Sequence, residues 1–209
     1  MPLPKTNMAL DVPKVIAGSS LWRRLDEHAE LQVALSNLRG VASRIAAKIS
    51  AVIPWLTEHS VDAHMDRLWA VADEVFTTKE IARFSPGEAF VLGCSFYVHD
   101  LGYALAVTEK GRNELRKHGA FKSTLERLLV VDGMSPEKAD QLALQLVSHL
   151  VHAKNAEPLV TEALPGLNGR YLLESPDLRN KWSRYIGQVS GSHHWSLADV
   201  DKKLGFGGA

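Results

Sequence analysis

The segment SPGEAFVLGCSFYVHD, residues 85–100, constrains the fold most strongly because it predicts a helix that is apolar on nearly every side. Ser85 and Glu88 have the spacing of a capping box, and Pro86 stands at the first helical position, which suits its fixed φ and missing N–H. A helix that is hydrophobic all round has to be surrounded by other elements. We therefore expect this helix at the centre of the fold, with Gly102 as its end.

Amphipathic patterns elsewhere predict helices that surround this central one. Apolar residues recur at intervals of three and four over 21–53 and 113–131. Further helices are predicted to begin after capping residues Ser60, Ser135, Ser175 and Ser196. The chain over 158–171 is turn-rich, and the sequence contains no alternating strand pattern, internal repeat or Gly-rich phosphate loop. These patterns predict an all-α helical bundle over 19–209, preceded by a flexible leader over 1–18.

Composition narrows the function classes. The 24 basic residues balance the 24 acidic ones, so no overall positive field attracts nucleic acid or an anionic membrane. The net charge does not exclude a local basic groove. No uninterrupted apolar run reaches the roughly 18 residues of a membrane span, and the N-terminus has no signal-peptide core. The single cysteine, Cys94, lies in an apolar run and is expected to be buried. We expect a cytoplasmic protein without a membrane partner and without an indication of nucleic-acid binding.

Nine histidines are the unusual feature of the composition, since imidazole is the commonest metal ligand. His99 and Asp100 close the central helix, where a polar pair is costly unless it is hydrogen-bonded or bound to metal. His64 precedes Leu68 by four residues and Val71 by seven, so it shares the inward stripe of its predicted helix. A histidine in such a stripe is often a hydrogen-bonded core residue. Metal binding and packing are therefore both open for His64.

Two further motifs carry histidines. In SGSHHWS, His193 and His194 are adjacent and point in different directions if they are helical, so we expect one to be a ligand and the other to lie behind it or face a substrate. In ELRKHGAFK, His118 precedes Gly119, and a glycine within a helical pattern indicates close packing or room for something bulky.

Taken in order, these motifs resemble the HD superfamily of metal-dependent phosphohydrolases. The resemblance rests on TEHSVDAHMDRL, FVLGCSFYVHDLGYA, LRKHGAFK and the terminal His-His pair, and it covers about residues 45 to 205. The first two motifs look especially like bacterial HD domains that precede a chaperone-type (Hsp90-like) ATPase domain. The resemblance implies an HD-type helical bundle that holds one or two divalent ions, with Mn, Fe, Ni, Zn and Mg as candidates. It also implies a small phosphorylated ligand or nucleotide, and an ATPase domain as a partner.

The resemblance assigns roles to individual residues. The implied metal ligands are His64, His99, Asp100, His118 and His194. The implied catalytic residues are Asp100, Arg67, His59 and His193. The implied substrate-binding residues are Arg67, Arg116 and Lys117. Asp100 would bridge the ions if two are bound, Arg67 would neutralise a phosphate, and a histidine among His59, His193 and His194 would protonate the leaving group.

One departure separates this sequence from the HD pattern. The superfamily's last ligand is an aspartate on a late helix, and after His194 the chain offers only Asp199 and Asp201 in different surroundings. We expect that the chain is cut before that helix; the alternative is an incomplete site. The two function hypotheses follow from this: a phosphohydrolase using metal-activated water, or a degenerate HD module that binds a nucleotide or metal and regulates a partner ATPase domain. A helical interaction domain with accidental histidines is the third interpretation. His149 and His152 lie one turn apart, a spacing that is common without metal, and are left outside the predicted site.

Overall fold

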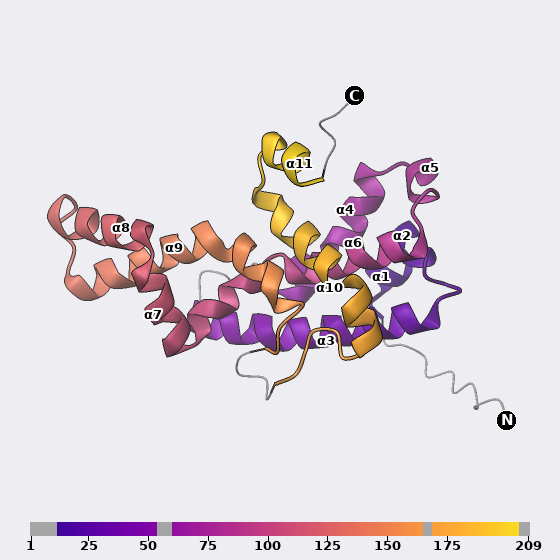
Figure 1. The fold of residues 1–209 in the computed structure, drawn as a ribbon, viewed down its shortest axis with the longest axis horizontal. Helices are drawn as coiled ribbons and strands as arrows, with labels where there is room; N and C mark the ends of the chain where they lie inside the picture. The colour runs from indigo at the N-terminus through magenta and orange to yellow at the C-terminus, as the bar shows by residue number, and fades with distance from the viewer. Residues whose placement is uncertain (1–11, 54–59, 165–168, 205–209) are drawn as a thin grey trace.

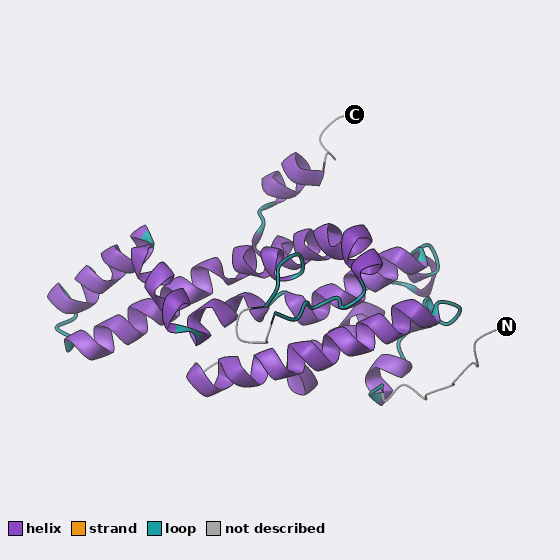
Figure 2. Cartoon of the chain, turned by 60° about the horizontal axis from the view of Figure 1, so that its bottom comes forward, coloured by secondary structure: helices purple, strands orange, loops and turns teal. Residues whose placement is uncertain are grey.

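The computed structural model describes residues 12–53, 60–164 and 169–204, which form helices and loops without any strand among them (Figures 1 and 2). The all-α prediction is confirmed. The helices are α1 (Lys14–Ala17), α2 (Ser20–Arg23), α3 (Ala29–Val52), α4 (Arg67–Val75), α5 (Thr78–Ile81), α6 (Pro86–Val98), α7 (Glu109–Lys117), α8 (Gly119–Val130), α9 (Pro136–Leu159), α10 (Pro176–Gly191) and α11 (Leu197–Leu204). Three short turns complete them: the π-helical η2 (Val61–Met65) and the 3₁₀-helical η3 (Leu101–Val107) and η4 (Ser192–His194).

Helix α6 is the buried central helix that the sequence predicts. Its capping box is formed, since Ser85 Oγ accepts the Glu88 N–H at 3.2 Å and Glu88 Oε2 accepts the Ser85 N–H at 2.7 Å. Cys94, Tyr97 and other residues around its circumference are fully buried. The α-helix ends at Val98, earlier than the predicted end at Gly102, and the chain continues as η3. The polar pair His99-Asp100 therefore lies at the joint between two buried elements.

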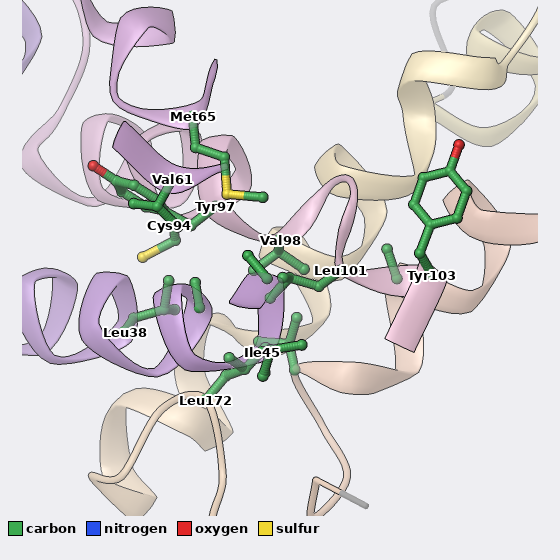
Figure 3. Close-up of a cluster of buried hydrophobic side chains, with 14 of the residues drawn as sticks. Leu38, Ile45, Val61, Met65, Cys94, Tyr97, Val98, Leu101, Tyr103 and Leu172 are labelled. Atoms are coloured by element: carbon green, nitrogen blue, oxygen red, sulfur yellow. The ribbon is translucent and has the colours of Figure 1, made fainter. Parts of the chain in front are cut away.

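Helices α3, α9 and α10 enclose this centre. Helix α10 packs on α6 and α9, α3 packs on α6 and η3, and η3 lies between α3 and α9. Figure 3 shows the shared core, in which Ile45 of α3 lies next to Val98 and Leu101, and Leu38 of α3 lies nearer to Cys94. The arrangement brings the end of α6 to the middle of α9 and to the end of α10.

A buried polar network ties η2 to this core. Arg39 of α3 donates to both oxygens of Asp66, at 2.9 and 2.6 Å, and the Tyr97 hydroxyl donates to Asp66 Oδ1 at 2.9 Å. The Trp69 Nε1–H in turn donates to the Tyr97 hydroxyl at 2.9 Å. Asp66 is only 3% exposed, so these partners supply the hydrogen bonds that water would otherwise provide. The network fixes the segment that carries His64.

Two segments differ from the sequence-based expectations. The predicted helix over 113–131 is two helices, α7 and α8, which meet at His118 in an extended conformation with ψ 137°. A Cβ on Gly119 would meet nothing within 4 Å, so close packing is not the reason for this glycine. Residues 1–11 of the predicted leader lie outside the described residues, but residues 14–17 form α1 and its Ile16 is fully buried.

One segment is long and apolar enough to span a membrane by composition alone, which the count of uninterrupted apolar residues did not reveal. It runs from Pro86 to Val107 over 22 residues, joins α6 to η3, and contains an 18-residue stretch with a mean hydropathy of 1.4. Of its most apolar stretch, 67% is buried within the bundle. Its hydropathy is therefore that of a core helix enclosed by α3, α9 and α10.

Candidate metal centre

Six titratable side chains converge where α6, α9 and α10 meet. They come from four places in the chain: His64 from η2, His99 and Asp100 from the end of α6, His152 from α9, and His193 and His194 from η4. Close backbone packing holds two of these places together. Gly102 of η3 lies so near to α9 that a Cβ there would stand 1.8 Å from the carbonyl oxygen of His152. Glycine at this position lets Asp100 approach His152.

The first group consists of His64, His99 and Asp100, whose donor atoms lie within 4.8 Å of one another. The Nε2 atoms of His64 and His99 are 3.2 Å apart. They lie 3.4 and 3.1 Å from the same carboxylate oxygen, Asp100 Oδ2. Two imidazoles and one carboxylate are a ligand set for a divalent ion.

The second group consists of His152, His193 and His194, and also converges within 4.8 Å. The Nε2 atoms of His152 and His193 are 3.0 Å apart, and the rings of His193 and His194 both flank His152, with centroid distances of 5.1 and 4.6 Å. Both adjacent histidines thus belong to one group, whereas a single ligand was expected from this pair. The chain has left α10 for the tighter turn of η4 at this point, so the α-helical directions assumed for them do not apply.

Asp100 joins the two groups. Its Oδ2 faces His64 and His99, while its Oδ1 lies 3.4 Å from His152 Nε2 in the second group. The residue is 5% exposed and carries a carboxylate that is costly to bury unless cations surround it. A carboxylate with one oxygen toward each of two ligand groups has the arrangement of a bridging ligand.

The histidine tautomers show that the site fits cations. His99, His152 and His193 each place Nδ1 near a backbone carbonyl three residues earlier, at 3.1, 2.7 and 2.7 Å. A carbonyl only accepts, so Nδ1 carries the proton and, in the neutral ring, Nε2 offers a lone pair. The lone pairs of His152 and His193 then face each other at 3.0 Å with no proton between them. His152 and His193 would hold a cation that removes this repulsion, and the Nδ1 bonds fix the ring orientations as metal ligands require.

Electrostatics favour the neutral imidazoles that bind metals. Burial lowers the pKa of His193, the neighbouring histidines lower it further, and the bond to the Ser190 carbonyl opposes this. Burial also lowers the pKa of His194, together with His152 and His149. Both rings therefore remain neutral, and able to ligate, to lower pH than a free histidine.

Tyr103 and His149 flank the second group. The Tyr103 ring stacks on His152 with a centroid distance of 4.3 Å, and its hydroxyl lies 2.7 Å from His149 Nδ1. Burial, with a contribution from the charge of Asp100, raises the pKa of Tyr103, so the phenol stays protonated. His149 is solvent-exposed yet held at the rim of the centre.

The structure places the other predicted site residues elsewhere. His118 is exposed at the start of α8, where its Nδ1 accepts the Ala120 N–H at 3.2 Å, and it belongs to neither ligand group. Arg116 forms a two-bond ion pair with Asp140 at 3.0 and 2.9 Å, and Lys117 pairs with Glu114 at 2.7 Å.

The other two predicted catalytic residues are Arg67 and His59. Arg67 is exposed at the first position of α4, three residues after His64. His59 lies outside the described residues.

The sequence reasoning missed His152 as a member of the site. It is 3% exposed, and it lies on one row of α9 with Ser148 and Ala156, all buried at intervals of four residues. The only signal in the sequence is a histidine with small residues four positions before and after it, because small neighbours allow another element to approach the ring closely.

The fold and the site define an all-α protein with a candidate His/Asp metal centre at the junction of its core helices. Sequence comparison identifies the family: the HD-CE family matches residues 53–208. The chain therefore belongs to the HD-CE family, and the prediction of an HD domain is confirmed. No curated protein and no solved structure gives a significant match.

Proposed function

We propose that this protein is a metal-dependent phosphohydrolase that cleaves a phosphoester of a nucleotide or a related small substrate. The observation that carries the proposal is the position of Asp100 between two ligand groups, with one carboxylate oxygen toward each. Paired divalent ions are a common device for phosphoester hydrolysis, because together they stabilise the attacking and the leaving oxygen.

The ions would supply an activated water and neutralise charge on the phosphoryl group. The side chains of the chain itself hold the geometry: His64 and His99 on one side of Asp100, and His152 with His193 and His194 on the other. His193 faces His152 through Nε2, so we assign it to metal binding and not to proton transfer. His149, exposed at the rim and held by Tyr103, is the group best placed to exchange a proton with a leaving oxygen.

The test is hydrolysis of a phosphoester panel by the chain loaded with Mn²⁺, compared with its Asp100→Asn and His152→Ala variants. We expect turnover by the wild type and a loss of at least about a thousandfold in the Asp100→Asn variant, since the Asp100 carboxylate faces both ligand groups and would help to hold both ions. Lys138→Ala is the control on an exposed side chain outside every predicted site and should retain activity. The proposal would be contradicted if Asp100→Asn kept full activity, or if no metal-loaded preparation hydrolysed any phosphoester of the panel.

A second candidate function is a nucleotide- or metal-binding HD module that regulates a partner ATPase domain without turnover. It is favoured by the place of Asp199, whose Oδ2 accepts from the N–H and hydroxyl of Ser196 at 3.1 and 2.7 Å and which belongs to neither ligand group. The last aspartate of the HD pattern thus has no counterpart in the centre among the described residues. Stoichiometric metal in a protein that hydrolyses no phosphoester would favour this second function.

A further inference from the structure

A concave surface lies between α8 and α9, which run side by side as a hairpin (Figure 1). It encloses about 600 Å³. Its α8 side carries Ser123, Thr124 and Arg127, and its α9 side carries Leu146, His149 and Leu150. We call this surface the α8–α9 groove. The volume is that of a small-molecule pocket, since such pockets span about 300–1,000 Å³.

The groove is continuous with the metal centre through His149. This residue lines the groove, and its ring lies 5.4 Å from the ring of His152 and 6.1 Å from that of His194, both in the second ligand group. From His152 to Leu146 the helix advances by six residues, or about 9 Å along its axis at 1.5 Å per residue. The organic substituent of a phosphate held at the centre would therefore be within reach of the groove.

The α9 side of the groove is apolar and uncharged. Leu146 and Leu150 are 45% and 57% exposed, which is high for large aliphatic residues in the middle of a long helix. Residues 141–153 include no Asp, Glu, Lys or Arg. Binding of a flat or apolar group to this surface is favourable because it removes apolar area from water. The surface has no charge to attract a second phosphate.

The α8 side supplies a few polar groups. Arg127 is the only formally charged residue of the lining, and its Nε is 3.9 Å from the nearest carboxylate, Asp132 Oδ2. An arginine held this loosely can stack its planar guanidinium on an aromatic ring. The Ser123 hydroxyl donates to the carbonyls of Gly119 and Ala120 at 3.3 and 3.2 Å. Its oxygen is therefore available to a ligand in the groove as a hydrogen-bond acceptor.

We propose that the α8–α9 groove binds the nucleoside part of the substrate, with the base covering Leu146 and Leu150 and stacking against Arg127, while the phosphate reaches the metal centre past His149. This inference rests on the proposed function for the position of the phosphate. It specifies the substrate class further, as an organic phosphoester with a planar group of nucleoside size instead of an inorganic or a short alkyl phosphate.

The experiment compares adenosine 5′-monophosphate with methyl phosphate as substrates of the Mn²⁺-loaded full chain, in the wild type and in Leu150→Asp. Leu150 is 57% exposed, so the substitution changes the groove without opening the core. Val130→Asp is the matched control, because Val130 is an equally apolar, 78% exposed residue of the same hairpin outside the groove lining. We expect kcat/KM for the nucleotide to fall at least about tenfold in Leu150→Asp, with the value for methyl phosphate unchanged and Val130→Asp like the wild type.

A binding measurement separates this inference from the proposed function. Fluorescence anisotropy of a fluorophore-labelled adenosine 5′-monophosphate reports binding to the metal-free chain without any turnover. Binding that weakens at least about fivefold in Leu150→Asp and in Arg127→Ala, and not in Val130→Asp, supports the groove even if no phosphoester is hydrolysed. Equal binding by all variants overturns it, and so does an equal loss of kcat/KM for both substrates. Stronger competition by octyl phosphate than by the unlabelled nucleotide would also overturn the nucleoside assignment.

Discussion

Gly102→Ala tests whether close packing of η3 on α9 aligns the metal centre. The added methyl carbon would stand 1.8 Å from the His152 carbonyl oxygen and 2.8 Å from the Ala156 nitrogen. Both are backbone atoms of a helix, so neither can rotate away. To restore a separation of 3.0 Å, η3 and α9 have to move apart by about 1.2 Å, the difference between 3.0 and 1.8 Å.

This shift acts on stability and on the site. Overpacking of this kind costs roughly 1–3 kcal/mol, and because backbone must move we expect about 3 kcal/mol, measured by urea unfolding. Metal–ligand distances tolerate only about 0.2 Å, so His152 should move out of ligating distance of an ion that the second group would hold. Isothermal titration with Mn²⁺ should show one of two binding events losing at least about tenfold in affinity, while the other is retained.

Gly111→Ala is the matched control for this prediction. Its methyl carbon would stand 1.7 Å from the Leu105 carbonyl oxygen, so it creates the same kind of backbone collision, but between α7 and η3 at a place that holds no ligand. Both variants should lose stability, and only Gly102→Ala should lose metal affinity. Equal metal affinities in the two variants, or a destabilisation by Gly102→Ala below about 1 kcal/mol, would refute the reasoning.

Three further predictions address other parts of the molecule. Tyr97→Phe removes a donor to Asp66 and the acceptor of the Trp69 N–H, so urea unfolding should show a loss of about 3 kcal/mol; a loss below 1 kcal/mol would show that water replaces the hydroxyl. His118→Ala removes the cap that accepts the Ala120 N–H and should cost about 1 kcal/mol without changing the metal content; loss of metal would restore His118 as a ligand. Mn²⁺ at a hundred times its Kd should stabilise the fold by about 2.7 kcal/mol per site, seen as a higher Tm that a chelator reverses; an unchanged Tm would contradict native-state binding.

Most of the helical framework could be predicted because it is specified by local signals. The capping box at Ser85 and the unbroken apolarity of the following residues identify α6 and its central place without any tertiary information. The same holds for helix starts such as Ser60, whose hydroxyl accepts the Ala63 N–H at 3.2 Å. The break between α7 and α8 was not predicted, because the apolar period runs on through His118 although the backbone there is extended.

The candidate site could be predicted only in part, since its members come from elements that meet through packing. His64, His99 and Asp100 stood out because the sequence pattern places each on or beside a predicted apolar stripe, where a polar side chain is costly. His152 did not, because its burial depends on how η3 seats against α9, and the sequence does not reveal that Gly102 permits this contact.

Metal stoichiometry is the most direct test of the central claim that Asp100 joins two ligand groups. Mass spectrometry of protein purified without a chelator would count the ions in the wild type, in His152→Ala and in His99→Ala/Asp100→Ala. We predict close to two divalent ions per chain, one in His152→Ala, and at most one, bound by the histidines of the second group, in the double variant. A wild type that holds no metal even after Mn²⁺ is added back would contradict the account.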